Sequence, residues 1–309
     1  MGSLCGQFLE YEVHSTEIFW LERLKSGQGD AWVRFTETPL DVGPSLRDAL
    51  FEPNSSVICV SATMTVADSF SYWLRRSGAA LVSDRSIYTG NFPSPFPYKD
   101  AVLLASASDA PLPEEESYQD FVNEAVERLV ISSGGSALIL FTSYEALRGA
   151  YAASHSNLEA SGIHCFKQGD DDRSRLLKAF LDDESSVLFA TDSFWEGVDA
   201  PGDTLRLVIL CRLPFRSPND PVFEARREAL EKRGGNAFME MSLPEAVMKF
   251  KQGFGRLMRR SSDRGAVVVL DSRILKKRYG SIFIKSLPET RQSFENFADL
   301  LSSVDRFLS

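Results

Sequence analysis

The sequence predicts an α/β fold in which a mostly parallel sheet carries helices on both faces. Short apolar runs recur along the chain and alternate with segments whose apolar residues have the spacing of an amphipathic helix. The runs are nearly continuous in apolar character, as expected of strands that crossover helices bury on both faces. The length of 309 residues is enough for two ordinary domains, each with its own core.

The N-terminal part of the chain combines a helical lead-in with a short piece of sheet. We expect residues 1–50 to be helical because Glu17–Lys25 has helical spacing and two glycines follow it. Residues 56–60 form an apolar run that is typical of a strand. A helix is expected over 67–76, ended by Gly78.

Strands and helices alternate regularly after a proline-rich stretch at residues 90–97, which indicates a domain boundary. No internal repeat is visible in the sequence. Ser293 is the expected N-cap of the last helix. The expected strands are 102–105, 136–141, 163–166, 187–190, 206–211 and 266–270, and the expected helices are 114–131, 144–153, 171–181, 224–233, 244–260 and 294–308.

The overall charge is acidic, with a formal net charge of −9 at pH 7 and a pI near 5.1. This argues against a protein that coats nucleic acid through general basicity, but it is compatible with a local basic groove. The cysteines and histidines are too scattered for a zinc or iron–sulfur site, so no metal ligands are expected. Cys59 and Cys211 lie in apolar runs and are expected to be buried free thiols.

The apolar runs also bear on localisation. The longest of them have strand length, so we expect no membrane span. The first residues lack the basic segment and apolar stretch of a signal peptide. A cytoplasmic location is therefore expected.

The strongest chemical pattern is the basic stretch 249–260, which holds five Lys and Arg residues and no acidic one. In a helix, Gln252, Arg256 and Arg259 would lie at i, i+4 and i+7 on one face. Two guanidiniums and an amide on one face can bind phosphoryl oxygens bidentately. The glycines within the stretch would let another surface approach closely, which a merely solvated basic face does not need.

The loop 190–203 follows one expected strand and precedes another, and it is rich in polar residues with two large aromatic ones. Trp195 could pack under the sheet or contact a base or ribose. Glu196 and Asp199 could cap helix ends, or meet a nucleotide and arginines across a cleft. Both interpretations stay open for each residue.

Two pairs of hydroxyl residues follow expected strands. Thr142 and Ser143 precede a helix, where they can cap it or offer donors to a phosphate. Ser61 and Thr63 have the same relation to the apolar run 56–60. Taken alone, the cap is the stronger interpretation for both pairs.

Together these four segments resemble the motifs of a superfamily-two helicase, and most closely of the DinG/XPD-like DNA helicases. Their order and spacing agree with that family from about residue 30 to 275. Residues 61–64 resemble motif III, 141–144 motif IV, 191–199 motif V and 252–259 motif VI, and 213–221 is similar to the bacterial DinG branch.

The resemblance implies RecA-like domains of the P-loop NTPase type, an ATP-driven motor on single-stranded DNA, and a role for each matching residue. Arg256 and Arg259 would contact the γ-phosphate of ATP bound on the neighbouring motor domain, with Arg259 as the arginine finger and Gln252 orienting the same site. The resemblance also implies that Glu196, Gly197 and Asp199 couple the nucleotide state to the affinity for DNA. Ser61 and Thr63 would couple ATP hydrolysis to closure of the two motor domains. The implied DNA-binding residues are Thr142, Ser143, Thr191 and Ser193.

Two family features are missing from the sequence. It contains no Gly-x-x-x-x-Gly-Lys-Ser/Thr, indeed no Gly-Lys dipeptide, and no Asp-Glu-Ala-His box. We therefore expect the C-terminal portion of a longer helicase, in which the first motor domain of the same polypeptide binds most of the ATP and Mg²⁺. Residues 1–50 would then be the end of the arch and the return to the first motor domain, 51–97 that domain's last strand and helix, and 98–309 the second RecA-like domain.

On this interpretation the parent is an ATP-dependent helicase of DNA repair or replication, and the isolated chain is inactive. Whether the parent carries an iron–sulfur cluster stays open, and none is expected in this chain. The expected partners are single-stranded DNA and the first motor domain, with no membrane. The alternative is a catalytically inactive module of the same fold that binds nucleic acid or a partner.

Overall fold

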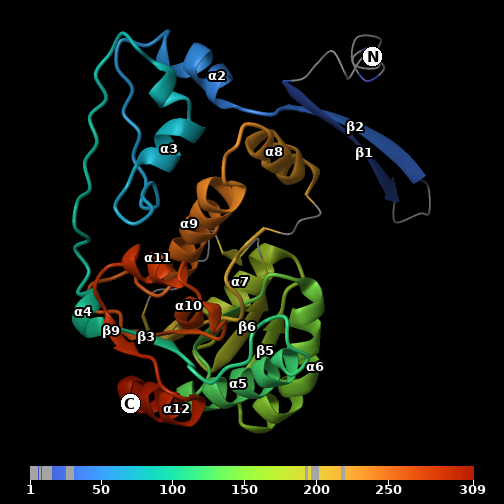
Figure 1. Cartoon of the computed structure of the whole chain (residues 1–309). Helices are drawn as coiled ribbons and strands as arrows, with labels where there is room; N and C mark the ends of the chain where they lie inside the picture. The colour runs from blue at the N-terminus through green and yellow to red at the C-terminus, as the bar shows by residue number, and fades with distance from the viewer. Residues whose placement is uncertain are drawn as a thin grey trace. The chain divides into compact units, whose positions relative to one another are not determined.

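The computed structural model describes residues 6, 8, 16–25, 31–191, 194–195, 202–216 and 220–309. They form two compact units (Figure 1). We call Val66–Asp68, Asn91–Phe215 and Glu245–Ser309 the sheet unit, and Met1–Thr65, Ser69–Gly90 and Arg216–Pro244 the hairpin unit. The chain passes from the hairpin unit to the sheet unit after Gly90, where the proline-rich stretch begins. Residues 216–244 belong to the hairpin unit, whereas we expected 98–309 to form a single domain.

The sheet unit is built on a seven-stranded sheet whose described strands are all parallel to their neighbours. The strand order is β5-β6-β4-β7-β8-β3-β9. The predicted α/β fold with a parallel sheet is confirmed. The strands are β3 (Val102–Ser106), β4 (Ala137–Leu140), β5 (His164–Lys167), β6 (Ser186–Ala190), β7 (Leu207–Leu210), β8 (Gly265–Val269) and β9 (Arg291–Ser293).

Helices cover both faces of this sheet. On one face, α5 (Tyr118–Ser133), α6 (Tyr144–Ala160) and α12 (Phe297–Leu308) pack on alternate strand residues such as Ile139 and Phe189. The strand residues in between point to the other face, where Leu210 lies under α9 (Leu243–Phe254). The remaining helices of this unit are α4 (Tyr98–Ala101), α7 (Arg173–Leu181), α10 (Arg273–Lys276), α11 (Gly280–Lys285) and the 3₁₀ turn η4 (Gly202–Thr204).

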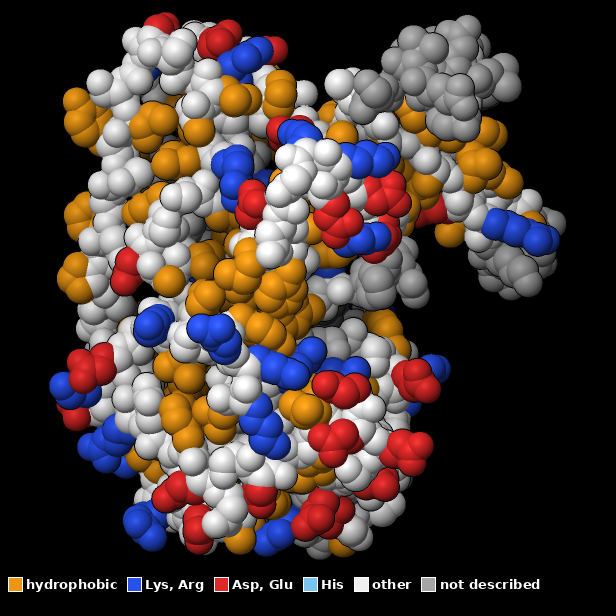
Figure 2. Space-filling view, viewed as in Figure 1, with side chains coloured by type: hydrophobic (Ala, Val, Ile, Leu, Met, Phe, Trp, Pro, Cys, Tyr) orange, Lys and Arg blue, Asp and Glu red, His pale blue; other side chains and the backbone are white. Residues whose placement is uncertain are grey.

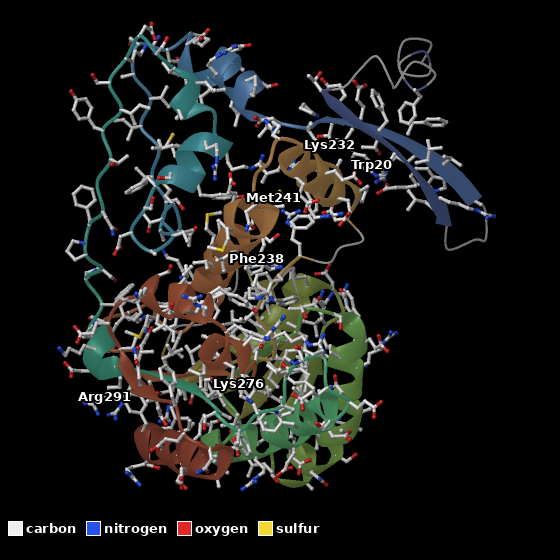
Figure 3. The ribbon with its side chains drawn as sticks, in the orientation of Figure 1. Trp20, Lys232, Phe238, Met241, Lys276 and Arg291 are labelled. Carbon is white, nitrogen blue, oxygen red and sulfur yellow. The ribbon has the colours of Figure 1, made fainter. Side chains whose placement is uncertain are left out.

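Most of the predicted sheet-unit elements are confirmed to within a few residues, because the strands are buried apolar runs and several of the helices have a side-chain cap. Asp172, for example, accepts a hydrogen bond from the backbone N–H of Ser174 at the start of α7. The side chain of Lys276, which Figure 3 labels on α10, donates to the carbonyl oxygen of Ala110 at 2.7 Å and so ties α10 to the loop after β3. None of the helices in the described ranges has the length and apolar character needed to cross a bilayer.

The hairpin unit contains an antiparallel pair, β1 (Glu17–Lys25) and β2 (Ala31–Pro39), in the register Glu17 to Pro39. Figure 3 labels Trp20 on β1. The helical elements of this unit are α2 (Gly43–Leu46), the π-helical turn η1 (Arg47–Phe51), α3 (Ser71–Arg76), the 3₁₀ turn η2 (Ala79–Leu81), α8 (Pro221–Lys232) and the π-helical turn η5 (Phe238–Ser242).

The helix predicted over Glu17–Lys25 is wrong, because this segment is strand β1. Its Ile, Phe and Trp residues favour a strand, and the facing segment Ala31–Pro39 offers a full-length partner for its backbone. The apolar pattern of this nine-residue segment fits both the period of a helix and the period of a strand, so hydrogen bonding to the facing strand β2 decides which structure forms.

The strand predicted over residues 56–60 is also wrong. These residues have no regular secondary structure, and none of them pairs with a strand within the described ranges. Ile58 is 88% exposed and Val60 is 86% exposed, and Cys59 is exposed rather than buried. Figure 2 shows hydrophobic side chains at the surface of the segment that carries α2 and α3.

Two predicted helix starts are displaced. Helix α3 begins at Ser71, because Ala67 and Asp68 have φ angles of 45° and 64° that no right-handed helix can include. Gly78 ends it as predicted: its φ is 76°, and a Cβ there would lie 2.0 Å from the carbonyl oxygen of Gly43. In α12 the N-cap is Asn296, whose side chain accepts from the N–H of Asp299. The predicted cap, Ser293, lies in β9 instead.

Candidate functional site

The carboxyl ends of β4, β5 and β6 lie at one edge of the parallel sheet, where ligands bind in such folds. Thr191, which follows β6, is buried and donates through its hydroxyl to Oε1 of Gln168 at 3.0 Å. Its backbone N–H donates to the same oxygen at 2.6 Å. The amide of Gln168 in turn donates to the hydroxyl of Tyr144 at 2.5 Å. A chain of polar contacts therefore crosses the edge from β6 to the start of α6.

Gln168 did not stand out in the sequence as a site residue. The available signal was its position: it is the first residue after β5, and its backbone N–H still bonds to Phe189 of the neighbouring strand. Its partners come from two other loops, and a single sequence does not reveal such contacts.

Ser143 caps α6. Its backbone is extended and its hydroxyl oxygen accepts from the N–H of Ala146 at 3.2 Å. The cap interpretation is confirmed, and the hydroxyl hydrogen of Ser143 is left over for another acceptor. Thr142 beside it is half-buried.

Trp195 is fully buried, so the interpretation in which it contacts a base is wrong and the packing interpretation is confirmed. A Cβ on Gly253 of α9 would lie 2.8 Å from two carbons of the indole. Gly253 therefore lets Trp195 approach the helix, as expected of a glycine at a close contact. Gly255 has no such role: a Cβ there would first meet the carbonyl oxygen of Lys251 in its own turn, at 3.2 Å.

The prediction that Gln252, Arg256 and Arg259 share one helix face is wrong. Helix α9 ends at Phe254, and the chain continues in tighter turns, with the N–H of Arg256 bonded to the carbonyl of Gly253 at 3.2 Å. Two glycines near the end lower the helix propensity of this segment. Gln252 is the only one of the three on the helix.

Asp263 anchors the turn that carries the arginines. Its Oδ2 accepts from the backbone N–H groups of Arg259 and Arg260 at 2.8 and 2.7 Å. Its Oδ1 accepts from the N–H of Gly202 at 3.2 Å, at the end of the loop 190–203. This buried carboxylate joins the end of the segment that resembles motif VI to Gly202, three residues after the segment that resembles motif V, and sequence reasoning missed it.

The surroundings of the turn are partly apolar and positively charged. The ring of Tyr98 stacks on Phe254 at a centroid distance of 5.6 Å. Burial raises the pKa of Tyr98, while a hydrogen bond with Ser94 and the positive charge of Arg259 act against that rise. Burial lowers the pKa of Lys251 on α9. Arg256 and Arg259 are themselves half-buried, which strengthens their electrostatic interaction with an incoming anion.

Ser61 and Thr63 belong to the hairpin unit and form a local turn. The N–H of Thr63 donates to the hydroxyl oxygen of Ser61 at 3.2 Å. No helix starts here, since α3 begins only at Ser71, so the helix-cap interpretation of this pair is wrong.

Four predicted site residues lie outside the described residues: Ser193, Glu196, Gly197 and Asp199. A search of the described part of the chain finds no group of three or more His, Cys, Asp or Glu side chains that could hold a metal ion.

The sequence matches the helicase C-terminal domain family over residues 126–290, which is just over half of the chain. This chain belongs to the helicase C-terminal domain family. Sequence identity to named DinG proteins likewise confirms the resemblance to the DinG/XPD-like helicases.

The chain is 36% identical over 282 residues to the 3'-5' exonuclease DinG of Bacillus subtilis, covering 90% of this chain and 30% of that protein. It is also 36% identical over 275 residues to the ATP-dependent helicase DinG of Mycobacterium tuberculosis, covering 88% of this chain and 40% of that protein. This chain therefore spans less than half the length of these relatives.

A solved structure of an XPD helicase has the same fold. The TM-score is 0.62 at 14% sequence identity, and the match covers 93% of this chain and 50% of that one. At this level of identity the likeness establishes the RecA-like helicase fold alone.

Proposed function

We propose that this chain is the C-terminal portion of a DinG-like, ATP-dependent DNA helicase that moves along single-stranded DNA. One observation carries the proposal: the buried carboxylate of Asp263 holds the turn with Arg259 to the end of the loop 190–203. A nucleotide-sensing arginine and the loop that reports nucleotide state are thus connected by hydrogen bonds to one side chain.

In this role Arg256 and Arg259 contact the γ-phosphate of ATP held by the first motor domain of the same polypeptide. Arg259 stabilises the charge that develops on the transferred phosphoryl group, and Gln252 orients the site. The half-buried guanidiniums suit an anionic ligand. The lysine and hydroxyl that hold triphosphate and Mg²⁺ in P-loop proteins come from the first motor domain, because this chain has no Gly-Lys dipeptide.

The single strand lies along the carboxyl edge of the sheet, where Thr142 and Ser143 bind a backbone phosphate. Ser143 is suited to this because its oxygen accepts the cap bond and its hydroxyl hydrogen can still donate. Thr191 has a different part, since its hydroxyl hydrogen already bonds to Gln168, and it positions that amide for the strand. Such phosphate contacts are independent of sequence, as a translocating enzyme requires.

The remaining implied roles complete this proposal. Ser193 contributes to the DNA contact, and Glu196, Gly197 and Asp199 couple nucleotide state to it. Ser61 and Thr63 couple hydrolysis to closure of the two motor domains.

The test is ATP hydrolysis by the full-length natural gene product, with and without an oligo(dT) strand. We expect stimulation by the strand, and no turnover by the isolated 309-residue chain. Arg259→Ala should lower kcat by about 10³-fold or more, because an arginine finger acts in the transition state. Its affinity for oligo(dT) without ATP should stay within about twofold of wild type, whereas Thr142→Ala should weaken that affinity by about fivefold, for one lost hydrogen bond of about 1 kcal/mol.

An equal loss of DNA affinity in Arg259→Ala would instead place Arg259 in the DNA groove. A natural product no longer than this chain that hydrolyses no ATP would favour the inactive binding module.

A further inference from the structure

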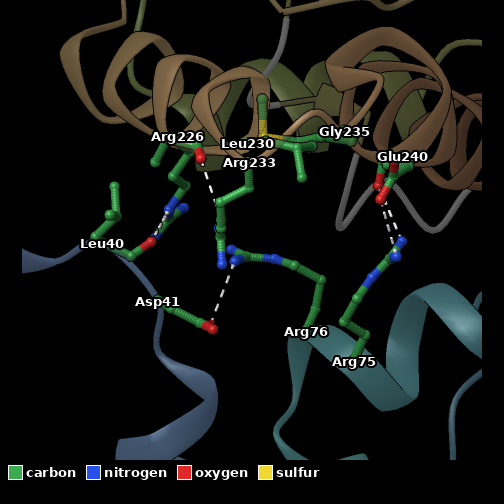
Figure 4. A pocket seen from close by; sticks show the side chains of 11 residues that line it. Leu40, Asp41, Arg75, Arg76, Arg226, Leu230, Arg233, Gly235 and Glu240 are labelled. Atoms are coloured by element: carbon green, nitrogen blue, oxygen red, sulfur yellow. Dashed lines mark hydrogen bonds and ion pairs between the residues drawn. The ribbon is translucent and has the colours of Figure 1, made fainter. Parts of the chain in front are cut away.

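The hairpin unit contains a cavity of about 360 Å³ that lies apart from the residues considered so far. It is bounded by the end of β2, by α3 and by one face of α8 (Figure 4). Its volume falls at the lower end of the range of small-ligand pockets, about 300–1,000 Å³. None of the residues that match the helicase motifs lines it.

The lining is dominated by arginine. Four guanidiniums face two carboxylates, those of Asp41 and Glu240, so the cavity carries an excess of positive charge. This excess stands out in a protein whose net charge is −9. The positively charged side chains are Arg75, Arg76, Arg226 and Arg233.

The sequence of α8 concentrates this charge on one face. Arg226, Ala229, Leu230 and Arg233 lie at i, i+3, i+4 and i+7 and line the cavity. Arg227 does not line it, and its guanidinium is bonded to Glu224 at 2.7 Å and to Glu231 at 3.0 Å. The third acidic side chain of α8, Glu228, lies 4.0 Å from Lys232, so none of the acidic side chains of α8 lines the cavity.

Two of the four arginines have structural tasks. Arg226 donates to the carbonyl oxygens of Leu40 and Pro39, at 2.9 and 3.4 Å, and so ties α8 to the end of β2. Arg75 forms an ion pair with Glu240 at 3.2 Å.

The other two retain capacity for an anion. Arg76 reaches Asp41 only at 4.0 Å, and that carboxylate is 57% exposed. Arg233 donates through Nε to the carbonyl of Ala229 at 3.1 Å, and no described carboxylate lies within ion-pair distance of it. In Figure 4, Arg76 extends into the cavity from α3 and Arg233 from α8. Two cationic side chains in one small cavity repel each other unless an anion lies between them.

The rest of the lining is apolar. Leu40, Leu230 and the buried Met241 of η5, which Figure 3 labels, supply it. A ligand with a phosphate and a less polar body, such as one nucleotide unit of a strand, matches this combination. Guanidiniums bind phosphate oxygens bidentately, which favours phosphate over a small halide.

We propose that Arg76 and Arg233 bind a backbone phosphate of a single DNA strand in this cavity. The inference rests on the proposed function for the identity of the strand. It adds a second phosphate contact, in the hairpin unit, to the contacts proposed at the edge of the sheet.

The test is binding of a fluorescent oligo(dT) 15-mer to the 309-residue chain without ATP, measured over a series of salt concentrations. Arg76→Ala and Arg233→Ala should each raise Kd by about fivefold or more and reduce the slope of log Kd against log salt by about 0.7, the value for one lost phosphate contact on a single strand. Arg233→Lys keeps the charge and should keep the slope. The matched control is Arg227→Ala, which removes the same charge from the same helix and should change Kd by less than about twofold.

Arg233 also donates to the carbonyl of Ala229 at the end of α8, so the thermal unfolding of each variant is measured as well. If Arg233→Ala is unstable, Arg76→Ala still tests the inference. An unchanged Kd and slope in both cavity variants would overturn the inference, as would an equal effect in Arg227→Ala. Absence of oligo(dT) binding would overturn it too, and so would cavity-dependent binding of dTMP without any binding of the oligonucleotide. An unchanged Kd in the cavity variants leaves the proposed function intact, because DNA-stimulated ATP hydrolysis by the full-length product tests that function separately.

Discussion

Residues 56–60 and strand β3 (Val102–Ser106) are both short apolar runs of the kind that predicts a strand, yet their environments are opposite. Strand β3 is hydrogen-bonded to β8 on one side and β9 on the other, and all five of its residues are buried. Residues 56–60 pair with no described strand and expose Ile58 and Val60 almost completely. An apolar run becomes a buried strand only where the chain supplies neighbours on both edges and helices on both faces.

The largest expected effect is on the stability of the protein, and it tests the difference between β3 and residues 56–60. Leu104→Ala in β3 should lower the free energy of unfolding by about 2–5 kcal/mol, because Leu104 is 1% exposed and its removal leaves a cavity. Ile58→Ala should change that free energy by less than about 0.5 kcal/mol, since the side chain is already in water. Urea denaturation of both variants checks this. A loss of more than about 1 kcal/mol in Ile58→Ala would mean that residues 56–60 are covered in solution.

A smaller effect on stability is expected at Gly253, and it tests how closely the sheet unit is packed. Gly253→Ala places a methyl group 2.8 Å from the fully buried indole of Trp195 and should cost about 1–3 kcal/mol. Gly149→Ala is the matched control: it lies inside α6, where the nearest atom to a Cβ is 3.5 Å away, and should gain up to about 1 kcal/mol in helix propensity. Thermal unfolding monitored by circular dichroism should show a lower melting temperature for Gly253→Ala and an equal or higher one for Gly149→Ala. Equal melting temperatures for both variants would show that Trp195 is loosely packed.

The smallest effect concerns β5, the strand at one edge of the seven-stranded sheet, whose His164 is exposed and bonded to Asp183. The hydrogen bond that the imidazole of His164 donates to Asp183, followed by the charge of that carboxylate, raises the pKa of His164 above 6.5. A raised pKa in the folded state means that the pair stabilises the protein below the unfolded pKa and that this stabilisation is lost as pH rises through the folded value. NMR titration of the imidazole should give a pKa above its ordinary value, and Asp183→Asn should lower it. The same pKa in both proteins would show that the pair does not persist in solution.

The sequence predicted the sheet unit well, because its strands are continuous apolar runs and its helices have clear periodicity and caps. It failed for Glu17–Lys25, where nine residues satisfy both a helical and a strand pattern and the facing strand decides. For the candidate site, motif resemblance pointed to Arg256 and Arg259, and their roles stay predictions. The sequence placed them on one helix face with Gln252, whereas α9 ends at Phe254 and Asp263 accepts from the backbone N–H of Arg259 in the turn that follows. Gln168 was missed because its partners, Thr191 and Tyr144, come from other segments of the chain.

The exposed run 56–60 also has a practical consequence. Its sequence, Ser-Val-Ile-Cys-Val, has no charge and no proline, and its backbone has no described strand partner. Uncharged apolar segments without a strand partner pair edge to edge with copies of themselves, and this association lowers the solubility of the protein. Polar replacements at Ile58 and Val60, which face water, are therefore the first substitutions to use for producing this chain in concentrated form.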